Sequence, residues 1–471
     1  MKLMKFKLLL SVTILSHFLS TAQDFKILSQ LQINENAYIS TLKIKRDEYG
    51  IGLLTNKGGM TKEQTINSVP NGLAILDDAV ILIGASEKNY KTTGYNATLF
   101  NKKSLAILKE QSLYSKGGSN RISSTLLKDV NNYFCYVLFR ETKFDEGFKF
   151  MGQSPFDTKY LESSSIKIVS LNNKLEQKNI TIKTEALDAY FAGACADDKR
   201  NIYICSFTNT AMLMEKFDST GKFLAKLSSP FSIWKNPDLD FLMKNDRDDQ
   251  GCITITSVCL NKNKQRAHQV IRFDFTNNKV LTPGEMILNK DYLKSLTNTN
   301  AAAKGSQFAF PEGLVPVQML EDAGRVIVVK EIRDQRAGGK GEATTYYRNG
   351  SVITIYNKKT FTVERDIVIN KSLATFVEPS EGIYTRLLDN YLWIITCENS
   401  GLISFKTYVT KLNLTTGEVV KTEIEKEDIG KGMVTFPKQT AWFKKEFAVP
   451  FTKVASPFSM SFETEFKLMP Y

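Results

Sequence analysis

Histidine, the side chain that most often transfers protons or binds metals, occurs twice in this sequence, as His17 and His268. His17 lies in an apolar N-terminal segment, which leaves His268 for the body of the chain. A single histidine strongly disfavours histidine-ligated metal sites and Ser-His-Asp or Cys-His nucleophile systems. The polar neighbours Lys264, Gln265 and Arg266 predict a surface loop around His268.

The six cysteines are few for 471 residues, and most lie in apolar, strand-like segments that predict buried thiols. Cys195 and Cys205 flank an acidic turn almost symmetrically. They could therefore face each other across a hairpin and form a disulfide in an oxidising compartment. A shift of the pairing by one residue would turn the two sulfurs apart, so both outcomes stay open.

Carboxylates gather at Asp197-Asp198 and at Asp246, Asp248 and Asp249, where they resemble cation ligands. The spaced acids, glycine and distal glutamate of a calcium loop are missing, however. Aspartate also favours tight turns, because its side chain accepts hydrogen bonds from nearby backbone groups. The turn-forming interpretation is therefore preferred, and no metal site is predicted.

Glu378, Glu381 and Asp389 are the remaining candidates for an acid pair of the glycosidase kind. The sequence contains no Cys-x-x-Cys pair, P-loop or glycine-rich dinucleotide motif. We therefore expect no cofactor, and a protein that binds is favoured over one that catalyses.

The chain is organised as a repeat of two short hairpins. Acidic or asparagine-rich turns close the first hairpin of each unit, and a strand-like run follows each turn. These turns are Leu76-Asp77-Asp78, Asp129-Val130-Asn131-Asn132, Asp197-Asp198, Asp248-Asp249-Gln250-Gly251, Glu321-Asp322-Ala323-Gly324 and Leu388-Asp389-Asn390. The second-hairpin turns are Asn101-Lys102-Lys103, Asn172-Asn173-Lys174, Ser219-Thr220-Gly221, Asn277-Asn278-Lys279, Asn357-Lys358-Lys359 and Thr415-Thr416-Gly417.

Four short strands per unit predict an all-β fold, a single β-propeller of four-stranded antiparallel blades. Apolar residues occupy both faces of strands such as 202–205, as expected for a blade covered on each side by a neighbour. We expect seven blades, with six or eight as the alternatives. The C-terminal region is one strand short, and residues 25–33 or 37–44 could supply that strand, so that paired N- and C-terminal strands close the ring.

Two long connections lie between second and third strands, on the end of the ring that commonly binds partners. Residues 141–164 are aromatic, which fits either packing on their own blade or partner binding. Residues 333–350 are basic and read as a solvated loop or as a contact for an acidic partner. The binding residues predicted from these segments and from a smaller one near residue 90 are Tyr90, Tyr95, Phe148, Phe150, Phe156, Arg333, Arg336, Lys340, Tyr346, Tyr347 and Arg348.

Residues 1–22 have the order of a secretory signal peptide: lysines, an apolar run and a small-residue site ending at Ala22. Residues 23–471 would then form the propeller domain, exported to a periplasm or the cell exterior and soluble, with no transmembrane segment after cleavage. Cleavage removes three lysines and no acid, which lowers the net charge from +12 to +9. This mild excess fits ordinary solubility or an anionic partner, and it gives no basis for nucleic-acid binding.

The repeated segment FDSTGKFL (217–224) resembles a motif that recurs once per blade in exported bacterial β-propellers of the kind seen in Bacteroidetes. The resemblance implies the fold and leaves the activity open. We expect a non-catalytic module that binds a protein partner, for example in a cell-envelope or outer-membrane assembly. The alternative is a propeller that binds or cleaves glycans with aromatic platforms and carboxylates.

Overall fold

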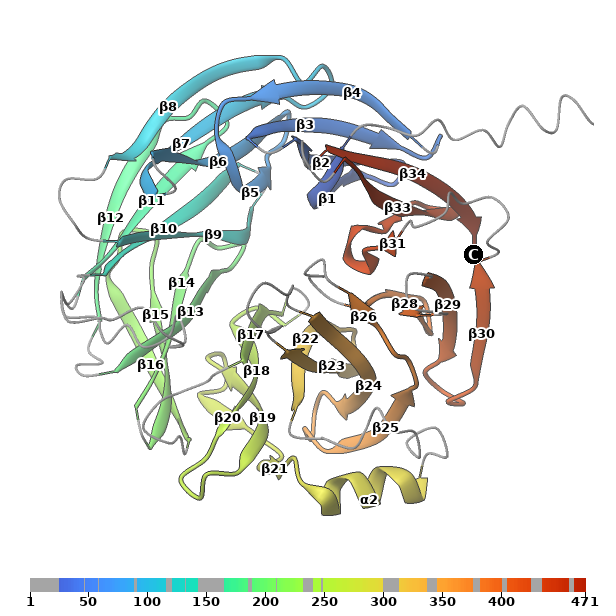
Figure 1. The fold of residues 1–471 in the computed structure, drawn as a ribbon. Coiled ribbons are helices and arrows are strands. Elements are labelled where there is room, and N and C mark those ends of the chain that lie inside the picture. Colours follow the sequence, from blue (N-terminus) through green and yellow to red (C-terminus); the bar gives the residue numbers. More distant parts are fainter. Residues whose placement is uncertain are drawn as a thin grey trace, which may run out of the picture.

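The computed structural model contains eight antiparallel sheets arranged as the blades of a propeller (Figure 1). The residues that it describes are 25–45, 47–57, 59–88, 91–115, 121–131, 133–142, 165–184, 189–208, 210–231, 240–246, 249–299, 313–336, 345–375, 382–399, 405–424, 434–456 and 461–471. We number the blades in chain order. The first strand of a blade faces the centre and the last faces the rim, as β9 and β12 show.

Blade 1 contains β1 (Lys26–Asn34), β2 (Ala37–Lys45), β3 (Glu48–Thr55) and β4 (Gly59–Ile66), and blade 2 contains β5 (Val69–Ile75), β6 (Ala79–Lys88), β7 (Lys91–Asn101) and β8 (Ile107–Ser115). Blade 3 contains β9 (Arg121–Asn131), β10 (Phe134–Thr142), β11 (Ser165–Asn172) and β12 (Gln177–Lys183). Blade 4 contains β13 (Tyr190–Ala196), β14 (Ile202–Phe207), β15 (Ala211–Phe217) and β16 (Phe223–Pro230).

Blade 5 contains β17 (Asp240–Asn245), β18 (Cys252–Leu260), β19 (Arg266–Asp274), β20 (Lys279–Leu281) and β21 (Glu285–Ile287). Blade 6 contains β22 (Leu314–Glu321), β23 (Arg325–Arg336), β24 (Thr345–Asn357), β25 (Val363–Ile369) and β26 (Ala374–Thr375). Blade 7 contains β27 (Ile383–Leu388), β28 (Tyr391–Asn399), β29 (Phe405–Asn413) and β30 (Val419–Ile424), and blade 8 contains β31 (Val434–Thr435), β32 (Ala441–Trp442), β33 (Glu446–Ser456) and β34 (Ser461–Pro470). A helix, α2 (Lys290–Thr299), lies on the outer rim beside β21 (Figure 1).

The core lies between the blades, because each central strand is buried on both faces. All six residues of β14 are buried, for example. Tyr203 and Cys205 pack against blade 5, whereas Ile202 and Ile204 pack against blade 3. This arrangement confirms the prediction made from the doubly apolar strands, and it explains why single-face amphipathic patterns are scarce.

The expected count of seven blades is wrong, since the described residues form eight sheets. Residues 26–66, which we assigned in part to closing the ring, form a complete four-stranded blade of their own. Its first turn contains Asn36 and its second begins at Asn56. Both turns follow the pattern of the other units, so this sequence signal was present and was missed.

Pairing between the N- and C-terminal strands is not seen among the described residues: β1 pairs with β2, and β34 pairs with β33. Blades 1 and 8 contact each other through side chains and through a backbone hydrogen bond between turns instead. The hydroxyl of Tyr38 donates to the carbonyl of Trp442 at 2.9 Å and accepts from its N–H at 3.0 Å. The N–H of Lys444 donates to the carbonyl of Glu35 at 2.9 Å.

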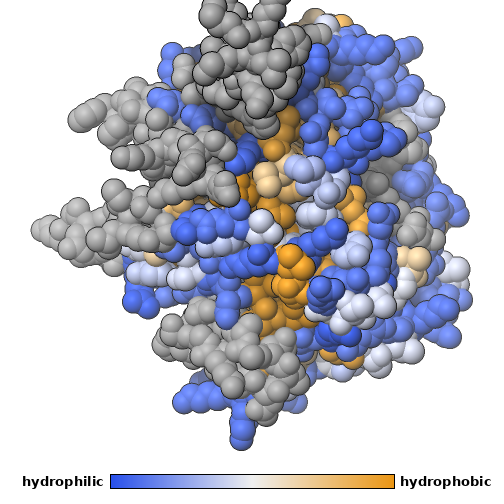
Figure 2. Space-filling view, turned by 90° about the vertical axis from the view of Figure 1, so that its right-hand side faces the viewer, coloured by the Kyte–Doolittle hydropathy of each residue, from blue (hydrophilic) through white to orange (hydrophobic). Residues whose placement is uncertain are grey.

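Blade 8 occupies three strand positions rather than four. The short strands β31 and β32 both pair with β33, on the edge opposite to β34. No strand pairs with the outer edge of β34 in the part of the chain that the structure describes. Figure 2 views the rim from the side of β30 and β34 and shows hydrophobic side chains reaching the surface there.

The described residues contain no helix with the length and apolar character needed to cross a membrane.

Candidate functional site

Strand alternation gives the ring two ends. The connections from first to second and from third to fourth strand lie at one end, which we call the turn face. The connections from second to third strand and those between blades lie at the other end, the loop face. The acidic turns lie on the turn face, and among the described residues no cluster of three or more His, Cys, Asp or Glu side chains could hold a metal ion.

Aspartates of the turn face hold their own turns, as the sequence predicted. The carboxylate of Asp197 accepts from the backbone N–H of Asn201 at 2.8 Å and from the Tyr203 hydroxyl at 2.9 Å. Asp322 accepts from the N–H groups of Gly324 and Arg325 at 2.8 and 2.7 Å. These oxygens satisfy backbone donors that the turns leave open.

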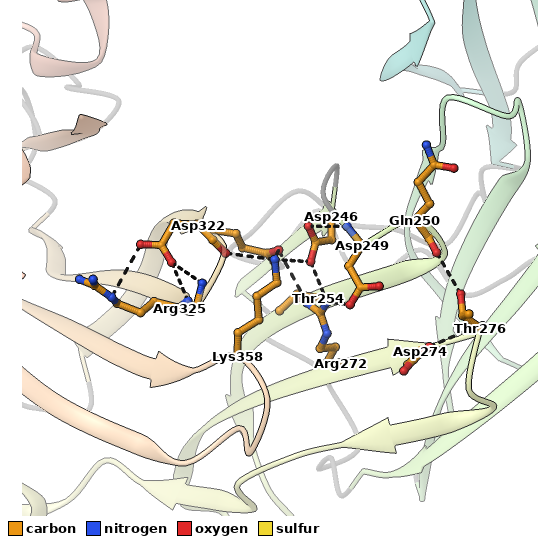
Figure 3. Close-up of polar contacts among 12 residues, drawn as sticks. Asp246, Asp249, Gln250, Thr254, Arg272, Asp274, Thr276, Asp322, Arg325 and Lys358 are labelled. Carbon is orange, nitrogen blue, oxygen red and sulfur yellow. Dashed lines mark hydrogen bonds and ion pairs between the residues drawn. The ribbon is translucent and has the colours of Figure 1, made fainter. Parts of the chain in front are cut away.

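A denser charge cluster joins blades 5 and 6 on the turn face (Figure 3). Arg272 of β19 donates through Nη2 to Asp246 at 2.7 Å and to Asp249 at 2.9 Å. Lys358, from the last turn of blade 6, reaches Asp246 at 2.7 Å. Glu321, at the end of β22, lies 3.7 Å from Arg272 and 3.9 Å from Lys358.

The two buried acids of this cluster respond to it in opposite directions. Burial acts to raise the pKa of Asp246, but hydrogen bonds from Lys358 and Arg272 outweigh burial and lower it. The pKa of Glu321 is raised, first by burial and then by the charge of Asp246. Since two cations face three carboxylates at bonding or near-bonding distances, the arrangement is a structural ion network that joins two blades.

His268 is buried in β19, so the surface loop expected for it is wrong. Its exposed fraction is 1%, and its Nε2 lies 2.8 Å from the Thr256 hydroxyl. Burial, followed by the charge of Lys330, lowers the pKa of His268 well below its usual value. The buried Lys330 amine donates to the Tyr292 hydroxyl of α2 at 3.3 Å, and burial lowers its pKa to about 8.

The segment 333–350, expected to be a loop, is largely a β-hairpin on the loop face. β23 runs to Arg336 and β24 begins at Thr345, so the pair extends beyond the blade. A β-bulge between Glu331 and Ile332 shifts the register there. The short strand β26 then pairs with Tyr346 and Tyr347 and adds a third strand to the projection. A β-bulge such as the one between Glu331 and Ile332 commonly changes the direction of a strand.

A fully buried ion pair holds the base of this hairpin. Glu331 and Lys371 have exposed side-chain fractions of 0%, and their charged atoms are 2.6 Å apart. The same Glu331 oxygen accepts from the Gly382 N–H at 2.9 Å, and Lys371 also donates to the Arg348 carbonyl at 2.7 Å. Burial lowers the pKa of Lys371, whereas the Glu331 charge opposes that shift.

Beyond the bulge, the hairpin combines aromatic rings and guanidinium groups. The Arg336 guanidinium lies 4.9 Å from the centre of the Tyr347 ring, and the Arg336 side chain is 68% exposed. Asp334 pairs with Arg336 at 3.3 Å. Tyr346 and Tyr347 are half-buried. Such aromatic and arginine groups recur at protein interfaces, where they supply apolar area and directed charge together.

Other predicted site residues have different positions. Tyr95 is buried, and its ring lies 5.6 Å from that of Phe139 in the core, so it is not a surface platform. Arg348 is 7% exposed, because it lies where the hairpin enters the blade, and Arg333 is half-buried beside Glu331. The remaining predicted residues lie outside the described part of the chain: Tyr90, Phe148, Phe150, Phe156 and Lys340.

Of the two outcomes left open for Cys195 and Cys205, the structure shows the one without a disulfide. Cys195 is paired with Tyr203 in the ladder, and Cys205 is paired with Gly193. The length of the turn between Ala196 and Ile202 sets this offset. Neither cysteine is part of a disulfide, and burial raises the pKa of the Cys205 thiol well above its usual value.

Glu331 and Lys371 were not predicted as site residues. One signal was available: Lys330 and Glu331 interrupt an otherwise apolar strand between Val329 and Ile332. Adjacent charges in a strand point to opposite faces, so each requires a separate buried partner if both faces are covered.

No family model matches the chain, and no curated protein matches it in sequence. Similar solved structures include the β-propeller domain of the Trilobed protease from Pyrococcus furiosus, described as having an open velcro topology, at 9% identity over 86% of this chain and 95% of that chain, with a TM-score of 0.39. The WD40 domain of SCAP from fission yeast is 9% identical over 96% of this chain and 93% of that chain, with a TM-score of 0.44. A putative 6-phosphogluconolactonase from Bacteroides uniformis is 9% identical over 85% and 95%, with a TM-score of 0.40. This likeness concerns the fold alone.

Proposed function

We propose that this propeller is a non-catalytic module that binds a protein partner through its loop face. The observation that supports this proposal is the projecting hairpin of β23 and β24, which presents Arg336 and Tyr347. Glu331 and Lys371 form a buried ion pair at the base of the hairpin. Separating the pair would leave an uncompensated buried charge, so the pair holds the base of the hairpin in place. A held projection loses less conformational freedom on binding than a mobile loop does.

The leader-like residues 1–22 support export, which would place the partner in a cell envelope or outside the cell. An outer-membrane assembly is one such partner. The partner surface would carry acidic and apolar groups to complement an exposed guanidinium and tyrosine rings.

The test is co-purification from the source cells under native conditions. We expect a stoichiometric protein with the unaltered chain, and its loss with the double variant Arg336→Ala, Tyr347→Ala. Tyr133→Ala is the matched control, since Tyr133 is 57% exposed on the turn face. Retention of the partner by the double variant would contradict the proposed surface.

Glycan binding is the second candidate, because the half-buried rings of Tyr346 and Tyr347 could stack on sugars. Retention on polysaccharide columns that depends on these rings, without any protein partner, would favour it over the first proposal.

A further inference from the structure

Blade 8 ends one strand early, at an edge that the outer strands of its neighbours do not cover. β34 pairs along β33 from Glu446 to Ser456 and has no second partner among the described strands. Each of the other seven blades has a fourth strand position. A strand added beside β34 would therefore complete the ring and would lie between β30 of blade 7 and β4 of blade 1.

The surfaces beside this position are exposed. On β30, Val420 and Thr422 face blade 8, because they pair with Lys411 and Val409, and Val409 packs against blade 8. Val420 is 52% exposed and Thr422 is also exposed, whereas Ile424, near the end of the strand, is buried. In the complete interface between blades 4 and 5, the corresponding face of β16 is buried at Leu227 and Ser229.

The face of β4 of blade 1 that is directed toward blade 8 is exposed as well. On β4, Glu63 and Thr65 pair with Gly52 and Gly50 of β3, which places them on the face toward blade 8. Both side chains are exposed. Hydrophobic side chains also reach the surface on this side of the molecule (Figure 2). An additional strand beside β34 would cover these faces of β30 and β4, as the outer strands of neighbouring blades cover each other elsewhere in the ring.

We propose that an extended segment of a partner protein, six to eight residues long as are most outer strands of this ring, adds to β34 as the fourth strand of blade 8. Backbone groups of β34 provide the pairing, and side chains select the sequence. This site is separate from the loop-face hairpin and does not depend on the function proposed for it.

The side chains of β34 define the chemistry of the segment. Glu463 and Glu465 lie on the face toward blade 7, whereas Thr464 and Phe466 lie on the face toward blade 1. Opposite charges on directly opposed residues stabilise a strand pair. The segment therefore alternates, with lysine or arginine opposite the two glutamates and apolar or β-branched residues between them. Lys467 lies on the same face of β34, so the acidic part of this edge is limited to Glu463 and Glu465, and Glu463 is itself paired with Lys453 of β33 in the ladder.

The N-terminus of the chain itself is the competing occupant. The Thr464 hydroxyl donates to the carbonyl of Phe25, so β1 begins beside β34. If the leader is removed after Ala22, only Gln23 and Asp24 precede Phe25. Two residues span at most about 7 Å, which is too short for a strand. The partner segment is therefore the occupant that we propose for the exported chain.

The test uses a labelled eight-residue peptide of alternating lysine and valine, with an alternating glutamate and valine peptide as its control. Binding to the chain beginning at Gln23 is measured by fluorescence anisotropy, and protection of residues 461–470 by hydrogen exchange. We expect saturable binding of the lysine peptide and protection of β34. The double variant Glu463→Lys, Glu465→Lys should weaken binding by about tenfold, as expected for two reversed cross-strand pairs. Glu110→Lys, on the outer strand of a complete blade, should leave it unchanged.

Three results would overturn the proposal. One is a lysine peptide that neither binds nor protects β34. Another is the absence of peptide binding, combined with protection of β34 that is seen in the chain with residues 1–22 and not in the chain beginning at Gln23. That result would show that the leader occupies the edge. The last is concentration-dependent self-association of the chain that Glu463→Lys, Glu465→Lys abolishes, which would assign the edge to a second copy.

Discussion

Lys330 is buried, and keeping its amine charged in the folded state costs free energy. Its pKa falls from 10.5 to about 8 because burial disfavours the charged form. That shift corresponds to about 3 kcal/mol of differential free energy. The amine contacts the Tyr292 hydroxyl at 3.3 Å and the Met286 sulfur at 4.0 Å, and the charge of Asp366 opposes the shift without reversing it.

Replacing Lys330 with methionine should therefore stabilise the protein at pH 7, by about 1–3 kcal/mol. The folded pKa lies below the unfolded one, so the unfolded chain binds more protons between about pH 8 and pH 10.5. The stability of the unaltered protein should rise through that window, and Lys330→Met should lack the rise. Urea unfolding at pH 7 and pH 10 measures both effects. Lys359→Met, at an exposed turn lysine, is the control; a less stable variant with an unchanged pH slope would contradict the account.

Gly382 is required where blade 7 meets the base of the hairpin. A Cβ atom there would lie 2.7 Å from the Lys371 amine, 2.8 Å from Glu331 Oε1 and 2.9 Å from the Arg348 Cβ. Gly382→Ala should separate a buried ion pair and destabilise the protein by about 3 kcal/mol in urea unfolding. Gly324→Ala serves as the control, because the nearest atom to its Cβ would be 3.9 Å away. Equal effects of the two substitutions would refute this role.

Residue environments were the least predictable property from the sequence. Tyr95, Arg348 and His268 were all assigned to exposed segments, yet each is buried. The reason is register: a polar-looking neighbourhood does not reveal which of two adjacent residues points into an interface between blades. The carboxylates of the turns were predicted well, since turn chemistry is local.

At the scale of elements, the network of Asp246, Arg272 and Lys358 connects a turn of blade 5 with a turn of blade 6. Asp246→Asn keeps the shape but removes the charge that both cations share, and should cost about 2 kcal/mol at pH 7. Because the folded pKa of Asp246 is lowered, its stabilisation is present above pH 4 and is lost as the pH falls through the lowered value.

Thermal unfolding between pH 7 and pH 3 should accordingly show a smaller acid-induced loss for Asp246→Asn than for the unaltered protein. Asp249→Asn is the comparison, since that side chain is 54% exposed and should change stability little. An acid response identical to that of the unaltered chain would show that Asp246 contributes no such linkage.

The hairpins of the repeat were largely predictable, because Asp, Asn and Gly mark their turns and apolar runs mark their strands. The continuation of β23 and β24 past the blade was not. Arg333 to Arg336 and Thr345 to Arg348 lack a strong alternating pattern, and their strand structure depends on the bulge at Glu331 and on β26. Those contacts are non-local and leave no sequence period.

For the whole molecule, the blade architecture followed from the repeat, but the count did not. The turns marked by aspartate belong to blades 2 to 7 and begin near Asp77, whereas blade 1 has Asn36 at this turn. The shortage of one strand at the C-terminus was recognised correctly, whereas its assignment to residues 25–33 or 37–44 was wrong.

Contact between blades 1 and 8 therefore depends on side chains such as Tyr38, whose hydroxyl bonds both backbone groups of Trp442. Tyr38→Phe would leave the N–H and carbonyl of Trp442 without this buried partner and should cost about 2 kcal/mol. Chemical denaturation measures the loss, with the exposed Tyr133→Phe as the control. No loss of stability would show that this contact does not hold the ends of the chain together.

The loop-face hairpin is proposed to contact a protein partner. The most direct measurement is site-specific photo-crosslinking in the source cells, with a photoreactive residue at position 336 or, for comparison, at position 133. We expect one crosslinked protein of defined mass from position 336 and none from position 133. Crosslinks to the same protein from position 133 alone, or no protein crosslink from position 336, would contradict it.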